Sequence, residues 1–150
     1  MAAGFSLCVD QLEQFIKYLE KTITPETLKD NPTSLSADAV VDMGGVTLNL
    51  VNGLEPLEPY GEGNPEPKFI IPNTRLVYVN LLKNGHVICN FSGLNGQRVN
   101  AIAFKAADTE IGAALLAGKD KNFHLLGVLK KDTWNGKTKI QIQLQDVMTA

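Results

Sequence analysis

A cluster of cationic side chains around a lone tryptophan is the part of this sequence with the clearest chemistry. The stretch "LKKDTWNGKTKIQ" contains Lys130, Lys131, Trp134, Lys137 and Lys139. Nucleobases stack on aromatic rings and ammonium groups attract phosphates, so this combination suits a single strand of nucleic acid. A tryptophan in a β-hairpin is as often a packing lid on the protein's own core, and both interpretations of Trp134 stay open.

Four further residues extend this candidate interface to other parts of the chain. Lys83 and His86 flank the turn "KNG", and Arg98 and Lys105 lie at the two ends of "RVNAIAFK". The predicted nucleic-acid-binding set is therefore Lys83, His86, Arg98, Lys105, Lys130, Lys131, Trp134, Lys137 and Lys139. A solvated surface position without a ligand is the alternative for each lysine.

No comparable set of residues points to catalysis or to metal binding. We expect the only histidines, His86 and His124, to be a polar loop residue and a strand residue rather than catalysts. Cys8 and Cys89 lie far apart, and neither has a neighbour at a zinc-ligand spacing. We expect two buried, reduced thiols in a cytoplasmic protein, with one disulfide as the alternative. No catalytic residue, metal site or cofactor is predicted within this chain.

The charge of the chain changes sign along its length. Residues 1–67 carry three basic and eleven acidic side chains, for a net charge of −8. Residues 68–150 carry eleven basic and five acidic side chains, for a net charge of +6. The asymmetry favours a polyanionic partner for the second half, with a chance distribution of lysines as the alternative. No apolar run approaches the ~20 residues that span a bilayer, so no membrane partner is predicted.

The second half has the element order of an OB-fold. Alternation of apolar and polar residues predicts strands at 68–82 (interrupted at Pro72-Asn73), 86–92, 97–105, 122–131 and 138–147. An alanine- and leucine-rich helix is predicted at 106–117, with Asp108 or Thr109 as its cap. Three strands, a helix and two strands predict a mainly β protein with a five-stranded OB barrel. In that fold the second and third strands and the adjoining loops bind oligonucleotides or sugars.

The first half predicts too few elements for a domain of its own. A helix is expected from Leu12, with Asp10 as its N-cap, because the apolar residues recur at helical spacing. A loop is expected at 29–36, a strand at 37–43 and helical structure at 46–57. Since a domain of about 60 residues is already marginal, we interpret residues 1–57 as an α/β remnant of a larger domain.

The segment "PYGEGNPEP" lies between the two halves. A flexible linker, a phosphate-binding loop and a joint of fixed shape are the three possible interpretations. Its prolines restrict flexing, its glycines suit positive φ at sharp turns, and Glu62 and Glu66 argue against a phosphate site. The segment 58–67 is therefore predicted to be a shaped joint, formed by Tyr60, Gly61, Gly63, Asn64, Pro65 and Pro67.

Four motifs resemble one known family in its order and at its spacing. "MAAGFSL", "LEPLEPYGEGNPEPKF", "VNAIAFK" and "WNGKTKIQIQLQDV" are similar to the C-terminal end of RecJ, the bacterial exonuclease specific for single-stranded DNA. The resemblance implies a parent protein with a catalytic DHH domain, which holds two divalent metals (Mn or Mg), and a DHH-associated domain. It further implies that residues 1–57 end that associated domain and that 68–150 form the OB-fold. The abrupt start "MAAGFSL" then indicates a partial chain.

The resemblance also implies a function. The OB-fold would bind single-stranded DNA and guide it to the missing catalytic domains for 5′→3′ degradation in DNA repair and recombination, in the bacterial cytoplasm. This chain alone is expected to be inactive as a nuclease. The alternative is a bracing or protein-interaction module that docks the catalytic domains or a single-strand-binding protein without touching DNA. Ile88 and Asn90 favour it mildly, because they stand at outward positions where the family often has basic residues.

Overall fold

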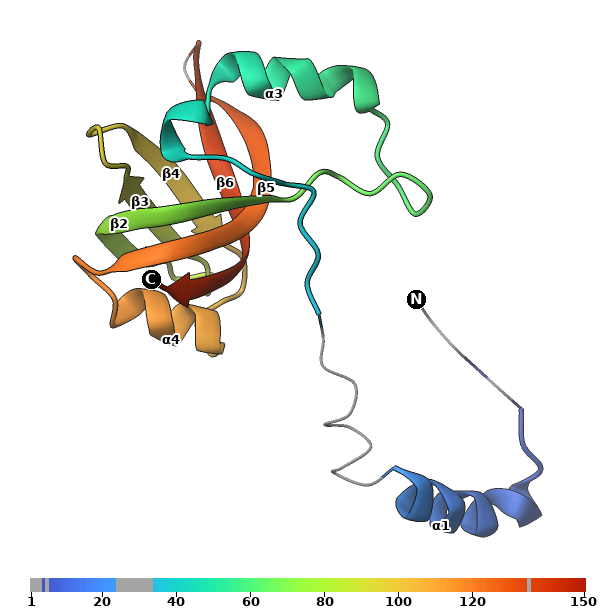
Figure 1. Cartoon of the computed structure of the whole chain (residues 1–150). Coiled ribbons are helices and arrows are strands. Elements are labelled where there is room, and N and C mark those ends of the chain that lie inside the picture. The colour runs from blue at the N-terminus through green and yellow to red at the C-terminus, as the bar shows by residue number, and fades with distance from the viewer. Residues whose placement is uncertain (1–3, 5, 24–33, 135) are drawn as a thin grey trace. The chain divides into compact units, whose positions relative to one another are not determined.

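The chain forms two compact units, residues 1–35 and 36–150 (Figure 1). The computed structural model describes residue 4, residues 6–23, 34–134 and 136–150; the side chain of Trp134 lies outside the described part. Most of the loop predicted at 29–36 also lies outside the described residues.

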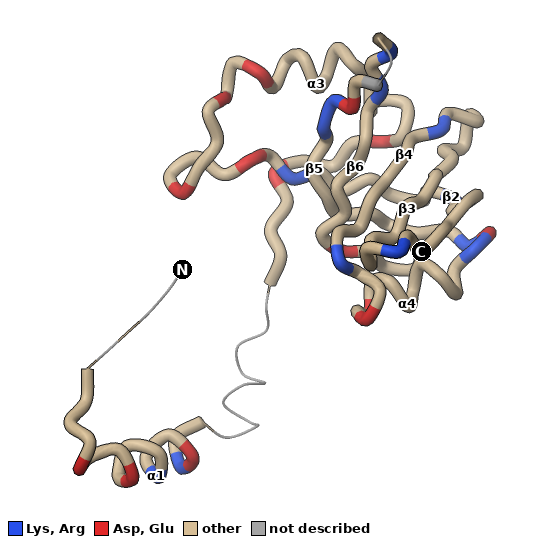
Figure 2. Tube along the Cα trace, turned by 180° about the vertical axis from the view of Figure 1, so that it is seen from behind, with Lys and Arg blue, Asp and Glu red and all other residues tan. Residues whose placement is uncertain are grey.

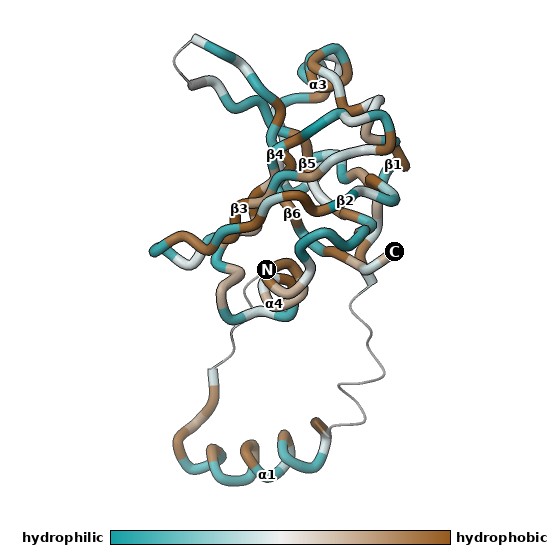
Figure 3. Tube along the Cα trace, turned by 90° about the vertical axis from the view of Figure 1, so that its left-hand side faces the viewer, coloured by the Kyte–Doolittle hydropathy of each residue, from teal (hydrophilic) through white to brown (hydrophobic). Residues whose placement is uncertain are grey.

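In the described residues of the first unit, a short 3-10 turn precedes a helix. The turn η1 spans Val9–Gln11 and the helix α1 spans Leu12–Thr22, as the spacing of apolar residues predicts. Figure 3 shows the resulting alternation of apolar and polar residues around α1. The prediction that Asp10 caps this helix is wrong, because the 3-10 turn places Gln11 at the N-cap without a side-chain hydrogen bond. Cys8, expected to be buried, is exposed, since no residue of η1 or α1 is buried.

The second unit is built on a closed barrel of five strands. These strands are β2 (Phe69–Leu81), β3 (Val87–Ser92), β4 (Arg98–Ala103), β5 (Asn122–Trp134) and β6 (Lys137–Thr149). They follow the order β2-β3-β4-β6-β5, and β5 pairs again with β2 to close the sheet. All pairs are antiparallel except β4 with β6, which run parallel. The predicted OB-fold is confirmed.

The interior of the barrel follows from the alternation in the sequence. Val87, Cys89 and Phe91 of β3 face inward and are buried, as are Ile142 and Leu144 of β6. The helix α4 (Glu110–Leu116) lies between β4 and β5 and adds fully buried Leu115 to the core. Of the two caps expected for α4, Thr109 is the one used, and its Oγ1 accepts a hydrogen bond from the Gly112 N–H at 3.2 Å.

Residues 36–57 pack with the barrel in the same compact unit. The strand β1 (Ala39–Val40) pairs in parallel with the start of β2. The turn η2 (Met43–Gly45), the helix α3 (Leu48–Leu54) and the turn η3 (Glu55–Leu57) follow. Met43, Val46 and Val51 are buried in the barrel's own core. Figure 1 shows α3 and α4 at opposite ends of the barrel. The segment assigned to the preceding domain by its sequence thus covers one end of the barrel.

The segment 58–67 has a defined shape held by side-chain hydrogen bonds. The Tyr60 hydroxyl donates to the Leu54 carbonyl at 3.0 Å, and Asn64 Nδ2 donates to the carbonyls of Leu57 at 2.7 Å and Pro59 at 3.1 Å. Positive φ is not the reason for its glycines: neither Gly61 nor Gly63 has a φ between +20° and +160°. The two glycines lie in a tight turn closed by an isolated bridge between Gly61 and Asn64.

Candidate nucleic-acid interface

A β-bulge in β2 decides which side chains reach the outer face of the barrel. Leu76 pairs with Phe91, and both are fully buried. One residue later the register shifts, so that Tyr78 pairs with Asn90 instead of with Cys89. Val77 is the extra residue, and an inserted residue reverses the side to which the following residues point. Tyr78 is therefore turned outward with 52% of its surface exposed.

A row of polar side chains crosses four strands at this level. Tyr78 lies opposite Asn90, Asn90 opposite Asn100, and Asn100 opposite Gln141. Asn90 Nδ2 donates to Asn100 Oδ1 at 2.8 Å, while Asn90 Oδ1 is buried without a partner in the described part of the chain. We call these four residues the amide row. They line an open groove of about 510 Å³ together with Val77, Ile88, Cys89, Arg98 and Ala101.

A second row, beside the amide row, carries positive charge. Arg75 lies opposite Ser92, and Ser92 lies opposite Arg98, so that two arginines share the outer face on either side of one serine. Arg98 is exposed, and Arg75 pairs with Asp120 at 3.1 Å with both side chains more than half exposed. Such exposed ion pairs are weak, so Arg75 remains available to an anionic ligand. We call Arg75, Ser92 and Arg98 the arginine row.

On the other side of the amide row the outer face is apolar. Ile88 lies opposite both Asn80 and Ile102, and the two isoleucines are half-buried. Two residues beyond Ile102, Phe104 exposes 52% of its surface. We call Asn80, Ile88 and Ile102 the aliphatic row. The strand register places Ile88 and Asn90 on the outer face, as the sequence predicts.

His86 and Lys105, two of the predicted site residues, hold neighbouring turns together. His86 Nδ1 accepts a hydrogen bond from the Lys105 N–H at 2.9 Å, and its ring packs edge-to-face on Phe104 at 5.1 Å between centroids. Lys105 has a positive φ of 48°, in the left-handed region. One ring nitrogen of His86 is thus occupied within the protein. Lys83, another predicted site residue, is exposed in the turn between β2 and β3.

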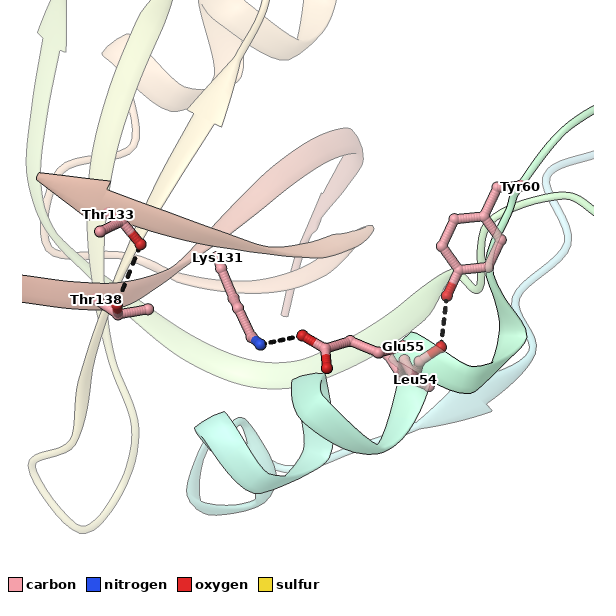
Figure 4. A network of polar contacts seen from close by, with 6 residues as sticks. All are labelled: Leu54, Glu55, Tyr60, Lys131, Thr133 and Thr138. Atoms are coloured by element: carbon pink, nitrogen blue, oxygen red, sulfur yellow. Dashed lines mark hydrogen bonds and ion pairs between the residues drawn. The ribbon is translucent and has the colours of Figure 1, made fainter.

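Lys130 and Lys131 on β5 are paired with carboxylates from the segment before β2. Lys130 Nζ lies 2.5 Å from Glu66 Oε1 and 6.0 Å from the centre of the Tyr60 ring. Lys131 Nζ pairs with Glu55 Oε1, as Figure 4 shows. Desolvation raises the pKa of the Tyr60 phenol, and the carboxylates of Glu58 and Glu66 raise it further, whereas Lys130 acts in the opposite direction. The two lysines are therefore not free cations.

The remaining predicted residues lie on the hairpin between β5 and β6. Lys137 and Lys139 are exposed, and Lys137 is the register partner of Trp134. The hydroxyls of Thr133 and Thr138 lie 3.1 Å apart and tie the two strands together (Figure 4). Because the side chain of Trp134 lies outside the described part, its role as a stacking platform or as a lid stays a prediction. Asn100 of β4 and Gln141 of β6 are register partners in a parallel pair. Arg98 lies two residues before Asn100, and Lys139 lies two residues before Gln141. Arg98 and Lys139 are therefore at the same end of the groove.

No cluster suited to holding a metal ion occurs in the residues that the structure describes. No three His, Cys, Asp or Glu side chains gather there in a way that could hold a metal ion. His124 Nδ1 accepts a hydrogen bond from the Asn73 N–H at 3.3 Å. Burial raises the pKa of the Cys89 thiol to about 12, which leaves it unreactive. Over the same residues, no helix has the length and apolar character needed to cross a membrane.

Tyr78, Arg75 and Asn100 are interface candidates that were missed from the sequence. All three belong to strands that were predicted, but their side of the barrel depends on strand register. The sequence carries no clear signal for the bulge, because the apolar residues of "RLVYVNLL" occupy both even and odd positions. The side to which Tyr78 points follows only from the pairing of β2 with β3.

A closed five-stranded barrel with this strand order is an OB-fold module. A polar groove lies over β3 and β4, the second and third strands of the barrel. OB-folds bind oligonucleotides or sugars on this face. The family model of the RecJ OB domain matches residues 37–146. The chain therefore belongs to the RecJ OB-domain family, and fold and family together place it among the nucleic-acid-binding OB modules.

Two of the solved structures that match this chain show the same fold over nearly its whole length. RecJ from Thermus thermophilus in complex with Mg²⁺ matches with a TM-score of 0.65 and 21% identity, over 97% of this chain and 21% of that one. The same protein in complex with Mn²⁺ matches with a TM-score of 0.62 and 22% identity, over 97% of this chain and 20% of that one. This chain thus spans about a fifth of the length of the solved RecJ chains. A comparison with curated proteins gives no match.

Proposed function

We propose that the outer face of the barrel binds single-stranded DNA without sequence specificity. The observation that carries this proposal is the bulge at Val77, which turns Tyr78 outward at the head of the amide row and beside the arginine row. An exposed aromatic ring next to guanidinium groups is the arrangement with which single strands are held, because every base has a face that stacks and every nucleotide has a phosphate.

In this proposal the three rows make different contacts with the strand. Arg75, Arg98 and Lys139 attract phosphates, while Tyr78 stacks on a base. Ile88 and Ile102 offer an apolar surface to the next bases. Stacking and charge attraction do not depend on base identity, so binding is expected to be tolerant of sequence. The groove is open along the row direction, which suits a strand passing through it rather than a small molecule enclosed by it.

In a longer RecJ protein, this module would guide the strand to a metal-dependent 5′→3′ exonuclease site. The proposal is supported by the family match and by the Mg²⁺ and Mn²⁺ complexes of the similar RecJ from Thermus thermophilus. Metal-activated water would perform the hydrolysis there. We expect the present chain to leave a labelled oligonucleotide intact with Mn²⁺ or Mg²⁺, and degradation from the 5′ end by nuclease-free protein would contradict this part of the proposal.

Fluorescence anisotropy of a labelled oligonucleotide tests the binding surface. Titrations at several salt concentrations, with single strand and with duplex, are compared for the wild type, Tyr78→Ala and Tyr18→Ala. Tyr18 is the matched control, because it is an exposed tyrosine on α1 in the other unit. Loss of one stacking platform costs about 1–3 kcal/mol, so Tyr78→Ala is expected to weaken single-strand binding about 5- to 150-fold. Equal affinities for the two variants would refute the assignment of Tyr78.

A second function is favoured by the aliphatic row and Phe104. This apolar surface is of the kind that packs against other proteins. The catalytic domains of a longer RecJ protein are one candidate partner. A single-strand-binding protein is another. In this bracing function the barrel docks a protein and does not contact DNA. An anisotropy titration without single-strand binding at low salt would favour it over the first proposal.

A further inference from the structure

Two of the three ion pairs in the described residues join the cationic half to an acidic segment of the same chain. Residues 55–66, which we call the acidic strap, contain Glu55, Glu58, Glu62 and Glu66 and no lysine or arginine. Figure 2 marks acidic residues in red along the segment between α3 and β2. Glu66 and Glu55 hold Lys130 and Lys131 on β5, so the strap covers two of the cations that the sequence assigns to nucleic-acid binding.

The position of Lys130 relates the strap to the proposed DNA surface. Lys130 is the register partner of Gln141, and Gln141 is the partner of Asn100. Neighbouring strands lie about 4.8 Å apart, so Lys130 lies two strands and about 10 Å along the sheet from Asn100, with both side chains on the outside of the barrel. A strand that follows the amide row across β4 and β6 therefore arrives at a lysine that already has a carboxylate partner.

The strap is held in place independently of the lysines. The Tyr60 hydroxyl and the Asn64 amide donate hydrogen bonds to carbonyls within the segment 54–59, and Val51 anchors the preceding helix in the core. Glu66 immediately precedes Pro67 and the first residues of β2, and its position opposite Lys130 continues the β2–β5 register. The carboxylates thus remain close to the lysines even when an ion pair opens.

We propose that the acidic strap is an internal competitor for the DNA phosphates at Lys130 and Lys131. This inference rests on the proposed function of the outer face. The ion pairs are partly exposed, so an incoming phosphate can exchange with a carboxylate at each lysine. Each phosphate must displace a carboxylate, so these lysines contribute little net affinity and little salt dependence. The strap thereby lowers the affinity of the barrel for DNA and allows the strand to move along its surface.

The test compares two variants that remove the same charge from the strap. Glu55→Gln/Glu66→Gln frees both lysines, whereas Glu58→Gln/Glu62→Gln alters two carboxylates that form none of the ion pairs in the described residues. Each freed phosphate contact adds about 0.7 to the salt slope for a single strand, which is about five-fold in affinity at 0.1 M salt. The first variant is therefore expected to bind a labelled oligonucleotide up to about 25-fold more tightly, with a slope steeper by about 1.4. The control is expected to keep the wild-type slope.

A second comparison keeps the inference testable if the first variant is less stable. Lys130→Gln/Lys131→Gln is expected to change the affinity of the wild type little, but to remove the gain in the Glu55→Gln/Glu66→Gln background. Thermal melting monitored by circular dichroism shows whether each variant is folded at the assay temperature.

The outcomes separate this inference from the proposed function. If the wild type binds and the strap variant has the same affinity and slope, the strap inference is overturned while the binding function stands. If neither protein binds at low salt, both are overturned. Binding by the strap variant alone supports the competitor role, because removing the two carboxylates then creates the binding surface.

Discussion

Gly112, in the first turn of α4, is the position where one added methyl group is expected to do the most damage. A Cβ at this position would overlap the carbonyl oxygen of Ala106 and lie 2.7 Å from its carbonyl carbon, closer than the 3.0 Å that real Cβ atoms reach. That carbonyl cannot move aside easily, because it accepts hydrogen bonds from the Thr109 N–H at 3.2 Å and from Thr109 Oγ1 at 3.0 Å. The clash is therefore with backbone that is fixed by the helix cap.

The size of the effect follows from two opposing contributions. Alanine favours a helix over glycine by about 1 kcal/mol, whereas overpacking a well-packed site costs about 1–3 kcal/mol and more where backbone must move. We expect Gly112→Ala to lower the free energy of unfolding by about 2 kcal/mol, which corresponds to a decrease in Tm of about 8 °C for a unit of this size. Thermal and urea unfolding, followed by circular dichroism, measure both quantities.

Gly53 in α3 provides the matched control. It is also a helical glycine, but no atom lies within 4 Å of the position that its Cβ would take. Gly53→Ala should therefore keep only the helix-propensity gain and stabilise the unit by about 0.5–1 kcal/mol. A Gly112→Ala variant that melts at or above the temperature of the wild type would refute the reasoning, because the close approach at Ala106 would then carry no cost.

Two further predictions concern the cationic hairpin and the cysteines. Lys137→Glu/Lys139→Glu is expected to weaken single-strand binding and to make the salt slope shallower by about 1.4. The control Lys17→Glu/Lys21→Glu on α1 should leave both the affinity and the slope unchanged. Equal effects of the two double variants would contradict a role for the hairpin. At pH 8 a thiol reagent is expected to modify exposed Cys8 quickly and buried Cys89 only after unfolding, since the Cys89 pKa of about 12 leaves about one thiolate in ten thousand. Mass spectrometry of the native protein checks this, and rapid double labelling would contradict the burial of Cys89.

The elements with a clear local pattern were predictable from the sequence. The predicted strand 86–92 is β3 within one residue, and the alternation that predicts a strand at 138–147 corresponds to the burial of Ile142 and Leu144 in β6. The cap of α4 was narrowed to two neighbours, of which Thr109 is used. These features depend on residues a few positions apart, so alternation and capping chemistry are sufficient to indicate them.

The features that decide the interface depend on residues far apart in the chain. The side of Tyr78 is set by a single extra residue in the pairing of β2 with β3, and nothing local marks its exact place. The partner of Lys131 is Glu55, 76 residues earlier, in a segment that the sequence assigned to another domain. A charge count treats such a lysine as free, whereas the folded chain neutralises it. Composition therefore overestimates the number of cations that are ready to meet a phosphate.

The short pairing of β1 with β2 has a mechanical consequence. The Asp38 N–H donates to the Lys68 carbonyl at 2.8 Å, and the Val41 N–H donates to the Ile70 carbonyl at 2.9 Å. Tension that enters the unit at residue 36 loads these few bonds before it reaches the ladders that close the barrel. The segment 36–57 would peel away first, taking Glu55 from Lys131 while the five strands stay intact. Force transmitted along the chain would thus be converted into a change of surface charge at β5.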